Sequence, residues 1–318
     1  MDYDKARLFS RILTMHYIEQ HNQSDISRML GLSTAKVNRI IRQARDEGYL
    51  EINIRTPFQS LFDLEQKLTS LVEIPEVLVC PTLSDDPNTV LRTMGATAAD
   101  YLLQHLRDGD VLCISGGKQV TEIVNALNPQ RKFDVTVVPA TGGVQGKHYT
   151  DVNHLAMELA KRLGGQALQL HAPLFADSVE ERNMLMNMRQ TREVLDRARH
   201  ADIALMGIGS IVPDSSSYFD LRSMSEADRK RLIEQGATGD VFAHLFDVNG
   251  KTVGQEHNEK LVGLTLSELR DIPLSVGVAA SGNKVSPILG ALRGHFFKAL
   301  ITDEVTTKQV LKLLEKGV

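Results

Sequence analysis

The amino-acid sequence predicts two domains: an all-α domain of the winged helix-turn-helix type over residues 1–56, and a Rossmann-like α/β domain over residues 57–318. Two short amphipathic helical patterns, joined by a turn that contains Gly31, indicate the first domain. Pro57 then interrupts the periodicity. From Val77 onward, apolar runs alternate with amphipathic helical stretches, and this alternation predicts αβα layers around a mostly parallel sheet.

Length and charge agree with this division. A chain of 318 residues is expected to form about two domains of roughly 150 residues each. Residues 1–56 carry nine Lys or Arg and seven Asp or Glu, whereas the remainder carries 27 and 33, so the net charges are +2 and −6. A mildly basic first domain on an acidic remainder fits a protein that contacts phosphate groups at one end only.

Composition excludes several other classes of protein. Cys80 and Cys113 both lie in apolar runs, which indicates buried thiols in a reducing compartment and not a disulfide framework. The sequence contains no metal-ligand motif, and we predict neither a metal nor a cofactor. The N-terminus lacks the apolar core of a signal peptide, and no run approaches the roughly 18 apolar residues of a membrane span. We therefore expect a cytoplasmic protein without a membrane partner.

The first two helices are predicted from apolar periodicity. Residues 4–20 form one helix, and Ser24 is expected to cap a second, Asp25–Leu30. The apolar positions that share a face are Leu8, Ile12, Met15 and Ile18 in the first helix, and Ile26, Met29 and Leu30 in the second.

The third helix is predicted over Thr34–Glu47. Gly31 ends the helix before it, Leu32 contributes to the core, and Ser33 provides the N-cap. The inward positions are Val37, Ile40, Ile41 and Ala44. After Gly48, the alternating residues Tyr49–Ile54 predict a short strand that would serve as a wing.

The outward face of this third helix is basic, and its chemistry suits the major groove of DNA. Arginine and asparagine pair with guanine and adenine edges, and a lysine or hydroxyl side chain binds phosphate or a base. Arg45, late in the helix, is assigned a structural role. The alternative is an ordinary three-helix bundle with a solvated basic face. The predicted DNA contacts are Ser33, Thr34, Lys36, Asn38, Arg39 and Arg42.

A helix over Phe58–Val72 follows the boundary, with Leu61, Leu64, Leu68 and Leu71 at helical spacing. It is interpreted either as a linker helix that contacts another copy or as a helix packed on its own domain. Both interpretations stay open at this point.

The remaining elements alternate along the chain, apart from Phe242–Val253, which we interpret as an antiparallel hairpin turning at Asn249-Gly250. Strands are predicted at Val111–Ser115, Val135–Pro139, Ala167–Leu170, Ile203–Ile208, Leu274–Ala280 and Ala299–Thr302. Helices are predicted at Val90–Leu106, Val120–Leu127, Val152–Leu163, Glu180–Arg199, Glu226–Glu234, Ser286–Leu292 and Val305–Leu314.

Glycine-rich turns at strand ends indicate a ligand site, because open α/β sheets bind ligands at the carboxyl ends of their strands. The first turn, Ser115-Gly116-Gly117-Lys118-Gln119, leads into a helix whose N–H groups suit an anion. It is neither a Walker A loop nor GxGxxG, so a plain tight turn is the alternative. Thr141-Gly142-Gly143 and Gly207-Ile208-Gly209-Ser210 end two further strands. Asp240 and Lys284 follow, as candidates for sugar hydroxyls and phosphate.

Taken together, these segments resemble the SorC family of sugar-binding bacterial transcriptional regulators, over nearly the whole chain. The matching segments, in the family's order, are LGLSTAKVNRIIRQARDEGYLEI, ISGGKQV, VVPATGGVQG, NHLAMELAKRLGG, ADIALMGIGSIVPDSSS, GATGDVFAHLFDVNGKTV, LVGLTLSEL and ALRGHFFKALITDE. The resemblance implies a winged helix-turn-helix joined to an effector domain that is similar to sugar-phosphate isomerases. It further implies a phosphorylated sugar or polyol as effector, operator DNA as partner, and a homo-oligomer, either dimer or tetramer.

The resemblance also implies which residues bind the effector. The phosphate would lie on the Ser115–Gln119 loop, flanked by Thr141–Gly143 and with Asn153 nearby. The full set is Ser115, Gly116, Gly117, Lys118, Gln119, Thr141, Gly142, Gly143, Asn153, Asp240 and Lys284.

The chain departs from the family's pattern at three places. Gln119 replaces a threonine, and Thr141 replaces a lysine that forms a Schiff base in some relatives, so covalent capture of the effector is not expected. Ala280-Ser281 stands where relatives often have two glycines.

Two other functions compete with a regulator. A sugar-phosphate isomerase or deaminase would share the fold, and Asp240 with Glu256 or His257 could supply its acid and base. No organised catalytic pattern is visible, however, and we predict no enzyme activity. The other is a sugar sensor that has lost DNA binding, against which Arg39 and Arg42 argue. The sequence does not distinguish a repressor from an activator.

Overall fold

The computed structural model describes residues 3–50, 58–144, 151–211, 216, 218–221 and 224–316. The chain divides into two compact units, residues 1–59 and residues 60–318. Each unit is described by itself.

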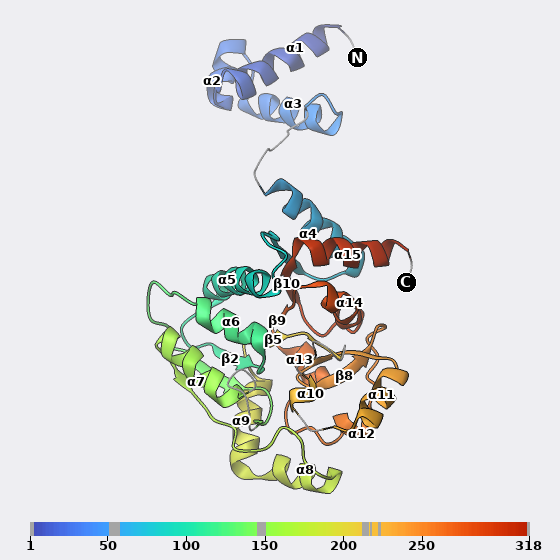
Figure 1. Cartoon of the computed structure of the whole chain (residues 1–318). Coiled ribbons are helices and arrows are strands. Elements are labelled where there is room, and N and C mark those ends of the chain that lie inside the picture. The colour runs from blue at the N-terminus through green and yellow to red at the C-terminus, as the bar shows by residue number, and fades with distance from the viewer. Residues whose placement is uncertain are drawn as a thin grey trace. The chain divides into compact units, whose positions relative to one another are not determined.

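The first unit contains three helical segments around one small core (Figure 1). Helix α1, Tyr3–Leu13, continues directly into a π-helical turn, Thr14–Ile18. Helices α2, Gln23–Leu30, and α3, Thr34–Asp46, follow. The core residues come from all of these segments, namely Phe9, Ile12, Met15, Ile26, Val37, Ile40, Ile41 and Ala44.

Helix α3 agrees with the sequence prediction. Its N-cap is Ser33, whose hydroxyl accepts a hydrogen bond from the Lys36 N–H at 3.2 Å. Gly31 ends α2 in the left-handed conformation, with φ of 64°. The predicted wing strand, Tyr49–Ile54, extends over residues 51–54, which lie outside the described residues.

Two predictions for α2 and its surroundings are wrong. The N-cap of α2 is Asn22 and not Ser24, because the Asn22 side chain accepts the Asp25 N–H at 2.9 Å and the helix already begins at Gln23. Met29 and Ile18 are exposed at 59% and 76%, so neither contributes to the core. Helical periodicity placed them on the apolar face, but the three packed segments are too small to cover that whole face.

The second unit is built on a seven-stranded sheet in which every neighbouring pair is parallel. In spatial order the strands are β1 (Glu76–Cys80), β10 (Ala299–Asp303), β9 (Leu274–Val278), β5 (Ile203–Gly207), β2 (Val111–Ile114), β3 (Thr136–Pro139) and β4 (Gln166–Ala167). The parallel α/β architecture is confirmed. Strand β1 is absent from the predicted runs, and β4 is shorter than predicted.

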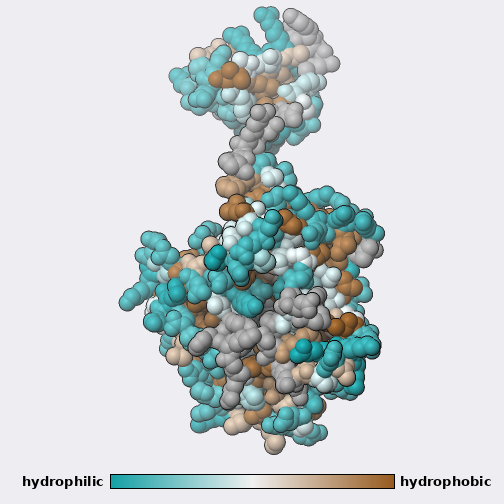
Figure 2. Space-filling view, viewed as in Figure 1, coloured by the Kyte–Doolittle hydropathy of each residue, from teal (hydrophilic) through white to brown (hydrophobic). Residues whose placement is uncertain are grey.

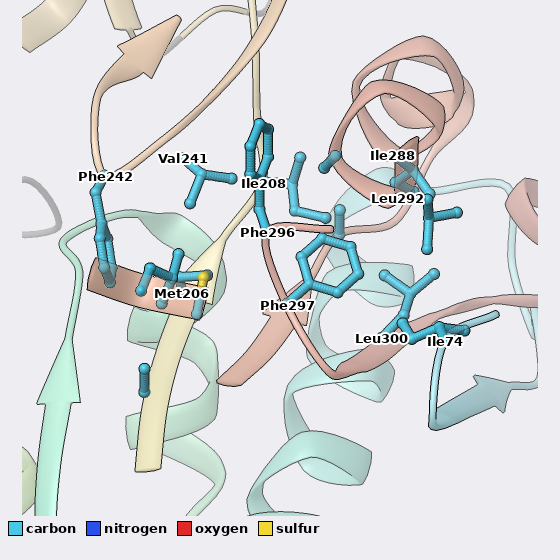
Figure 3. Packing of buried hydrophobic residues seen from close by; sticks show 14 of the residues in the cluster. Ile74, Met206, Ile208, Val241, Phe242, Ile288, Leu292, Phe296, Phe297 and Leu300 are labelled. Carbon is cyan, nitrogen blue, oxygen red and sulfur yellow. The ribbon is translucent and has the colours of Figure 1, made fainter. Parts of the chain in front are cut away.

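Helices cover both faces of this sheet (Figure 1). On one face lie α5 (Pro87–His105), α6 (Lys118–Ala126) and α7 (Val152–Leu163). On the other lie α4 (Gln59–Val72), α9 (Arg189–Arg199), α13 (Leu266–Asp271), α14 (Val285–Arg293) and α15 (Glu304–Glu315). Successive strand residues point to opposite faces, so Leu112 belongs to one core and Cys113 to the other. Figure 3 shows part of the core on the face that α4, α9, α13, α14 and α15 cover. Phe296, Phe297, Met206 and Leu300 all belong to this core.

Helix α4 packs on its own domain. Leu61 and Leu68 are buried in the core below it, and Lys67 forms an ion pair with Glu315 of α15 at 2.5 Å. Leu71, which the periodicity places on the same apolar face, is 48% exposed. The structure thus supports the second of the two interpretations of this segment.

The predicted helix Glu180–Arg199 is wrong as a single element. It is divided into α8 (Val179–Asn187) and α9, because Met188 is extended, with φ of −60° and ψ of 132°. The shorter helices α10 (Tyr218–Leu221), α11 (Glu226–Glu234) and α12 (Gln255–Asn258) accompany the second sheet.

That second sheet is small and antiparallel, in the order β6 (Gly209–Ser210), β7 (Ala237–Val241) and β8 (His244–Asp247). An antiparallel insertion is confirmed, but its principal turn is Phe242-Ala243 and not Asn249-Gly250. Both turn residues have positive φ, 50° and 62°. Asn249-Gly250 does form a turn, with the Gly250 N–H donating to the Asp247 carbonyl at 3.0 Å, but the returning chain pairs only as a Phe246–Thr252 bridge.

Candidate effector pocket and nucleic-acid interface

A pocket opens at the carboxyl ends of β2, β3 and β5, beside the β7–β8 turn, with a volume of about 610 Å³ including its open mouth. Seven predicted residues line it, namely Ser115, Gly116, Gly117, Gln119, Thr141, Gly142 and Asp240. Gly207 and Gly209, from the glycine-rich turn predicted at the end of β5, also line it. Sequence reasoning assigned no site role to the other lining residues, which are Val144, Val152, Leu174, Tyr218, Leu221, Phe242 and Ala243.

The N-terminus of α6 meets this pocket. Gly117 is its N-cap, with φ of 128°, and no side chain caps the first turn. Ser115 is buried, and its hydroxyl accepts the Gly207 N–H at 3.3 Å while donating to the Gly116 carbonyl at 3.0 Å. These bonds fix the loop, and the helix N-terminus supplies both N–H donors and a positive dipole end, the features that bind anions.

The glycines at the end of β3 have a packing role. A Cβ at Gly142 would lie 2.2 Å from the Pro173 carbonyl oxygen, so this position requires glycine whether or not an anion binds. Asn153 lies next to Gly143, but its amide is used in the fold. Its Nδ2 donates to the Leu170 carbonyl at 3.2 Å, and its Oδ1 accepts the Leu170 N–H at 2.8 Å. Neither Gly143 nor Asn153 is among the described residues that line the pocket.

Asp240 projects from β7 into the pocket. A Cβ at Gly209 would lie 1.7 Å from its Oδ1, so the carboxylate depends on the glycine of the neighbouring strand. Burial raises the pKa of Asp240 from 3.8 to about 6, against the opposing effects of Lys284 and of a hydrogen bond from the Ala243 N–H. Burial thus brings the pKa of this carboxyl closer to neutral pH than that of an exposed aspartate.

Lys284 is buried behind the pocket. Its Nζ donates to the Ile208 carbonyl at 2.9 Å, in the segment between β5 and β6. Burial lowers its pKa to about 8; the charge of Asp240 opposes this shift and that of Lys118 adds to it. Lys284 is not among the described lining residues, and neither is the exposed Lys118. The structure thus gives Lys284 a direct role in holding the Ile208–Gly209 segment beside Asp240.

Gln119 is the polar side chain at the start of α6 that lies closest to β5. A Cβ at Gly207 would lie 3.0 Å from the Gln119 Oε1. Gly207 and Gly209 thus allow two polar side chains to approach the end of the same strand. The alternating glycines were visible in the sequence, but the side chains they accommodate lie about 90 and 30 residues away along the chain, so only the structure identifies them.

Five of the six predicted DNA-contacting residues lie within α3, and all six side chains are exposed. Two of the six also have structural bonds: Ser33 caps the helix, and the Thr34 hydroxyl donates to Ser27 of α2 at 3.3 Å. The remaining four, Lys36, Asn38, Arg39 and Arg42, form the outward face. Arg45 donates to the Tyr17 hydroxyl at 3.5 Å, in agreement with its structural assignment.

The acid and base that an isomerase would need do not converge. Glu256 and His257 line a different pocket, together with Asp228 and Arg231 of α11. Among the described residues of the first pocket, Asp240 is the only side chain that carries a carboxyl, imidazole, amine or guanidinium group. Within the described part of the chain, no helix is long and apolar enough to cross a membrane.

A helix-turn-helix unit joined in one chain to a parallel α/β unit with a pocket at its strand ends is the architecture of a DNA-binding regulator with a ligand-binding domain. Residues 56–312 match the family described as "Putative sugar-binding domain", and the chain belongs to this family. The predicted relationship to the SorC regulators is confirmed.

Similar proteins match over almost their whole length. The chain is 27% identical to the deoxyribonucleoside regulator of Bacillus subtilis, over 98% of this chain and 99% of that protein. It is 29% identical to the sorbitol operon regulator of Klebsiella pneumoniae, over 97% and 99%, and 30% identical to the transcriptional regulator LsrR of Escherichia coli, over 95% and 94%. The crystal structure of full-length SorC from Klebsiella pneumoniae superposes with a TM-score of 0.74 at 27% identity, over 98% of this chain and all of that one. The chain is therefore a DNA-binding transcription regulator with a sugar-binding domain.

Proposed function

We propose that the pocket binds a phosphorylated sugar or polyol, and that this effector alters the binding of α3 to an operator of a carbohydrate or polyol catabolic operon. Two of the similar proteins are named a sorbitol operon regulator and a deoxyribonucleoside regulator, which supports this class of target. The protein acts on DNA in the cytoplasm as a dimer or tetramer, because paired half-sites are read by paired recognition helices.

One observation carries the phosphate assignment: the N-terminus of α6 opens on the pocket without a side-chain cap, at Gly117. A phosphate there accepts hydrogen bonds from the first-turn N–H groups, and the exposed ammonium of Lys118 adds favourable charge. Asp240 in the same pocket accepts hydrogen bonds from sugar hydroxyls. Asn153 and Lys284 do not line the pocket but bind the backbone of Leu170 and of Ile208, and Gly143 lies beside Asn153.

The same arrangement favours a regulator over an enzyme. Proton transfer in sugar-phosphate isomerisation needs a positioned base and a positioned acid. Among the described residues, Asp240 has no acidic or basic partner at the pocket other than the buried Lys284. We therefore propose that the effector is bound and released unchanged.

The test is binding of sugar phosphates and of the same sugars without phosphate, measured by thermal shift and by calorimetry. We expect stabilisation by the phosphorylated forms only. Gly117→Asp places a carboxylate at the phosphate position and should abolish this stabilisation while basal operator binding remains.

Gly109→Asp is the matched control. Gly109 also has positive φ, 94°, and a Cβ there would meet no atom within 4 Å, yet this glycine lies outside the pocket lining. Equal responses of the two variants to a sugar phosphate would place the effector elsewhere. Turnover of a sugar phosphate that Asp240→Asn abolishes would establish the enzyme instead.

A further inference from the structure

Ser281, just beyond the end of β9, adopts a backbone conformation that is ordinarily found only for glycine. Its φ is 94° and its ψ is 158°. A residue with a side chain is strained in this conformation, which persists only where the surrounding structure holds it. Strained residues are concentrated at sites where their position matters for function. Ser281 therefore needs partners that hold it in place.

Those partners belong to a buried polar cluster at the carboxyl end of β10. The Ser281 N–H donates to the Asp303 Oδ1 at 3.1 Å and to the Thr306 hydroxyl at 2.9 Å. The Thr306 hydroxyl donates in turn to the Asp303 carboxylate, and both residues are buried. Thr82, which follows β1, donates to the Asp303 Oδ2 at 2.9 Å, and the Thr306 N–H donates to the same oxygen at 3.2 Å. A buried network in which each acceptor has its donors is rigid, so the cluster holds Ser281 firmly.

The conformation of Ser281 determines the course of the chain to Lys284. The Ser281 carbonyl accepts the Lys284 N–H at 3.0 Å, across the 3₁₀ turn Gly282–Lys284. From this turn the Lys284 ammonium reaches the Ile208 carbonyl, beside Asp240. Since each residue has only two freely rotating backbone bonds, a change of φ at Ser281 would move the whole turn. The ammonium would then leave the Ile208 carbonyl.

We propose that Asp303 and Thr306 are positioning residues of the effector pocket. They hold Ser281 in its strained conformation, from which Lys284 supports the chain beside Asp240. Neither Asp303 nor Thr306 is among the described residues that line the pocket, so they act on its shape and not on the ligand itself. A binding site keeps its geometry through supporting contacts of this kind. The inference rests on the proposed function, because it concerns the same pocket.

The first test needs no ligand, because it measures how well Lys284 is protected in the full chain. An amine-reactive reagent labels each lysine according to its exposure, and mass spectrometry gives the rate at each position. The surface seen in Figure 2 is largely hydrophilic, and exposed lysines provide the internal standard. Lys284 is 8% exposed and should react slowly. Thr306→Val removes a hydroxyl that accepts the Ser281 N–H, and labelling of Lys284 should become roughly fivefold faster, the effect of losing one hydrogen bond.

Two further variants separate the hold on Ser281 from a general loss of stability. Thr307→Val is the matched control, because it removes an equally buried hydroxyl of α15 that donates to the Asp303 carbonyl, and labelling should stay as in the wild type. Adding Ser281→Gly to Thr306→Val should restore slow labelling, because glycine adopts this φ without strain and no longer needs to be held. A general loosening of α15 would not be reversed by a change at Ser281.

Two measurements extend the test to the pocket itself. Burial raises the pKa of Asp240 and the charge of Lys284 opposes this, so the Asp240 titration should move to higher pH in Thr306→Val. The pH dependence of urea unfolding, with and without Asp240→Asn, measures that shift. Thermal stabilisation by sugar phosphates should fall in Thr306→Val and persist in Thr307→Val.

The outcomes distinguish this inference from the proposed function. Unchanged labelling of Lys284 in Thr306→Val, or equal acceleration in Thr307→Val, would overturn the positioning role even if sugar phosphates bind. If labelling and the Asp240 titration change as expected but the wild type binds no sugar phosphate, the positioning role stands and the proposed effector is wrong.

Discussion

At the scale of single residues, the pocket depends on one buried pair of opposite charges. Asp240 and Lys284 lie on separate elements, and Ile208–Gly209 passes between them with its carbonyl bound to Lys284 and its glycine against Asp240. Removing one member of a buried pair leaves the other without its compensating charge, which is costly. Lys284 is therefore best understood as a positioning residue for Asp240.

The raised pKa of Asp240 makes a prediction with a definite sign. The folded chain holds this proton more tightly than the unfolded chain, about 6 against 3.8, so the contribution to stability is complete below pH 4 and is lost as pH rises through 6. Asp240→Asn removes that titration. The free energy of unfolding, variant minus wild type, should rise by about 2 kcal/mol between pH 4 and pH 6.5, at roughly 1.4 kcal/mol per pKa unit.

Urea unfolding at the two pH values measures this difference. Asp108→Asn is the control, because hydrogen bonds from the Asp134 N–H and from Arg131 lower the pKa of Asp108. Its carboxyl is therefore largely ionised in both the folded and the unfolded chain over this pH range, and its removal should leave the stability difference nearly constant. If the free energy of unfolding, variant minus wild type, does not change with pH for Asp240→Asn, the carboxyl of Asp240 has an ordinary pKa in the folded chain.

Some of the residues predicted for the site lie at the pocket, and others form hydrogen bonds within the fold that the sequence does not show. Glycine-rich turns after apolar strands predicted a common location for Ser115, Gly116, Gly117, Gln119, Thr141 and Gly142, and all six line one pocket, whereas Lys118 is not among its described lining residues. The uses of Asn153 and Lys284 could not be read from the chain, because their partners are backbone groups of Leu170 and Ile208 that only folding brings near. The sequence alone does not distinguish a polar side chain that binds a ligand from one that forms a hydrogen bond with the protein backbone.

At the scale of elements, caps and apolar periodicity predicted the bounds of α3, whereas the position of the hairpin turn depends on which side chains are buried in the folded domain. Ser33 and the apolar periodicity located α3 to within one residue. Phe242-Ala243 lacks the Asn-Gly signature of a tight hairpin turn, yet both residues adopt positive φ. Phe242 is 3% exposed, and burying such a side chain gains about 1.5–3 kcal/mol, which offsets much of the cost of about 1–2 kcal/mol for each of the two left-handed residues.

The cap of α2 provides a test at this scale. Asn22→Ala should remove the hydrogen bond to the Asp25 N–H and cost about 1 kcal/mol of local stability. Hydrogen exchange of the α2 amides should then become about fivefold faster, since 1.4 kcal/mol corresponds to tenfold. Ser24→Ala is the matched control: Ser24 lies inside the helix, where alanine is favoured, so exchange should not accelerate. Equal acceleration in both variants would contradict the assignment of the cap.

At the scale of the whole molecule, DNA binding and effector binding belong to different compact units and should be separable by mutation. Arg39→Ala removes an exposed guanidinium from α3, and sequence-specific operator binding should be lost while sugar phosphates still raise the melting temperature. Arg45→Ala, late in the same helix beside Tyr17, should retain operator binding. Loss of both activities in the Arg39 variant would show that the two units do not act separately.

Coupling between those two units must be reciprocal, and this is the sharpest test of a metabolite switch. If a sugar phosphate weakens operator affinity by some factor, saturating operator must weaken the affinity for that sugar phosphate by the same factor. A coupling of about 1–3 kcal/mol, the usual range, corresponds to roughly 5- to 150-fold in each direction. Calorimetric titration of the effector, with and without operator, measures one factor, and operator binding with and without effector measures the other. The Arg39→Ala variant should show neither. Unequal factors would mean that the effector acts by changing the assembly of copies.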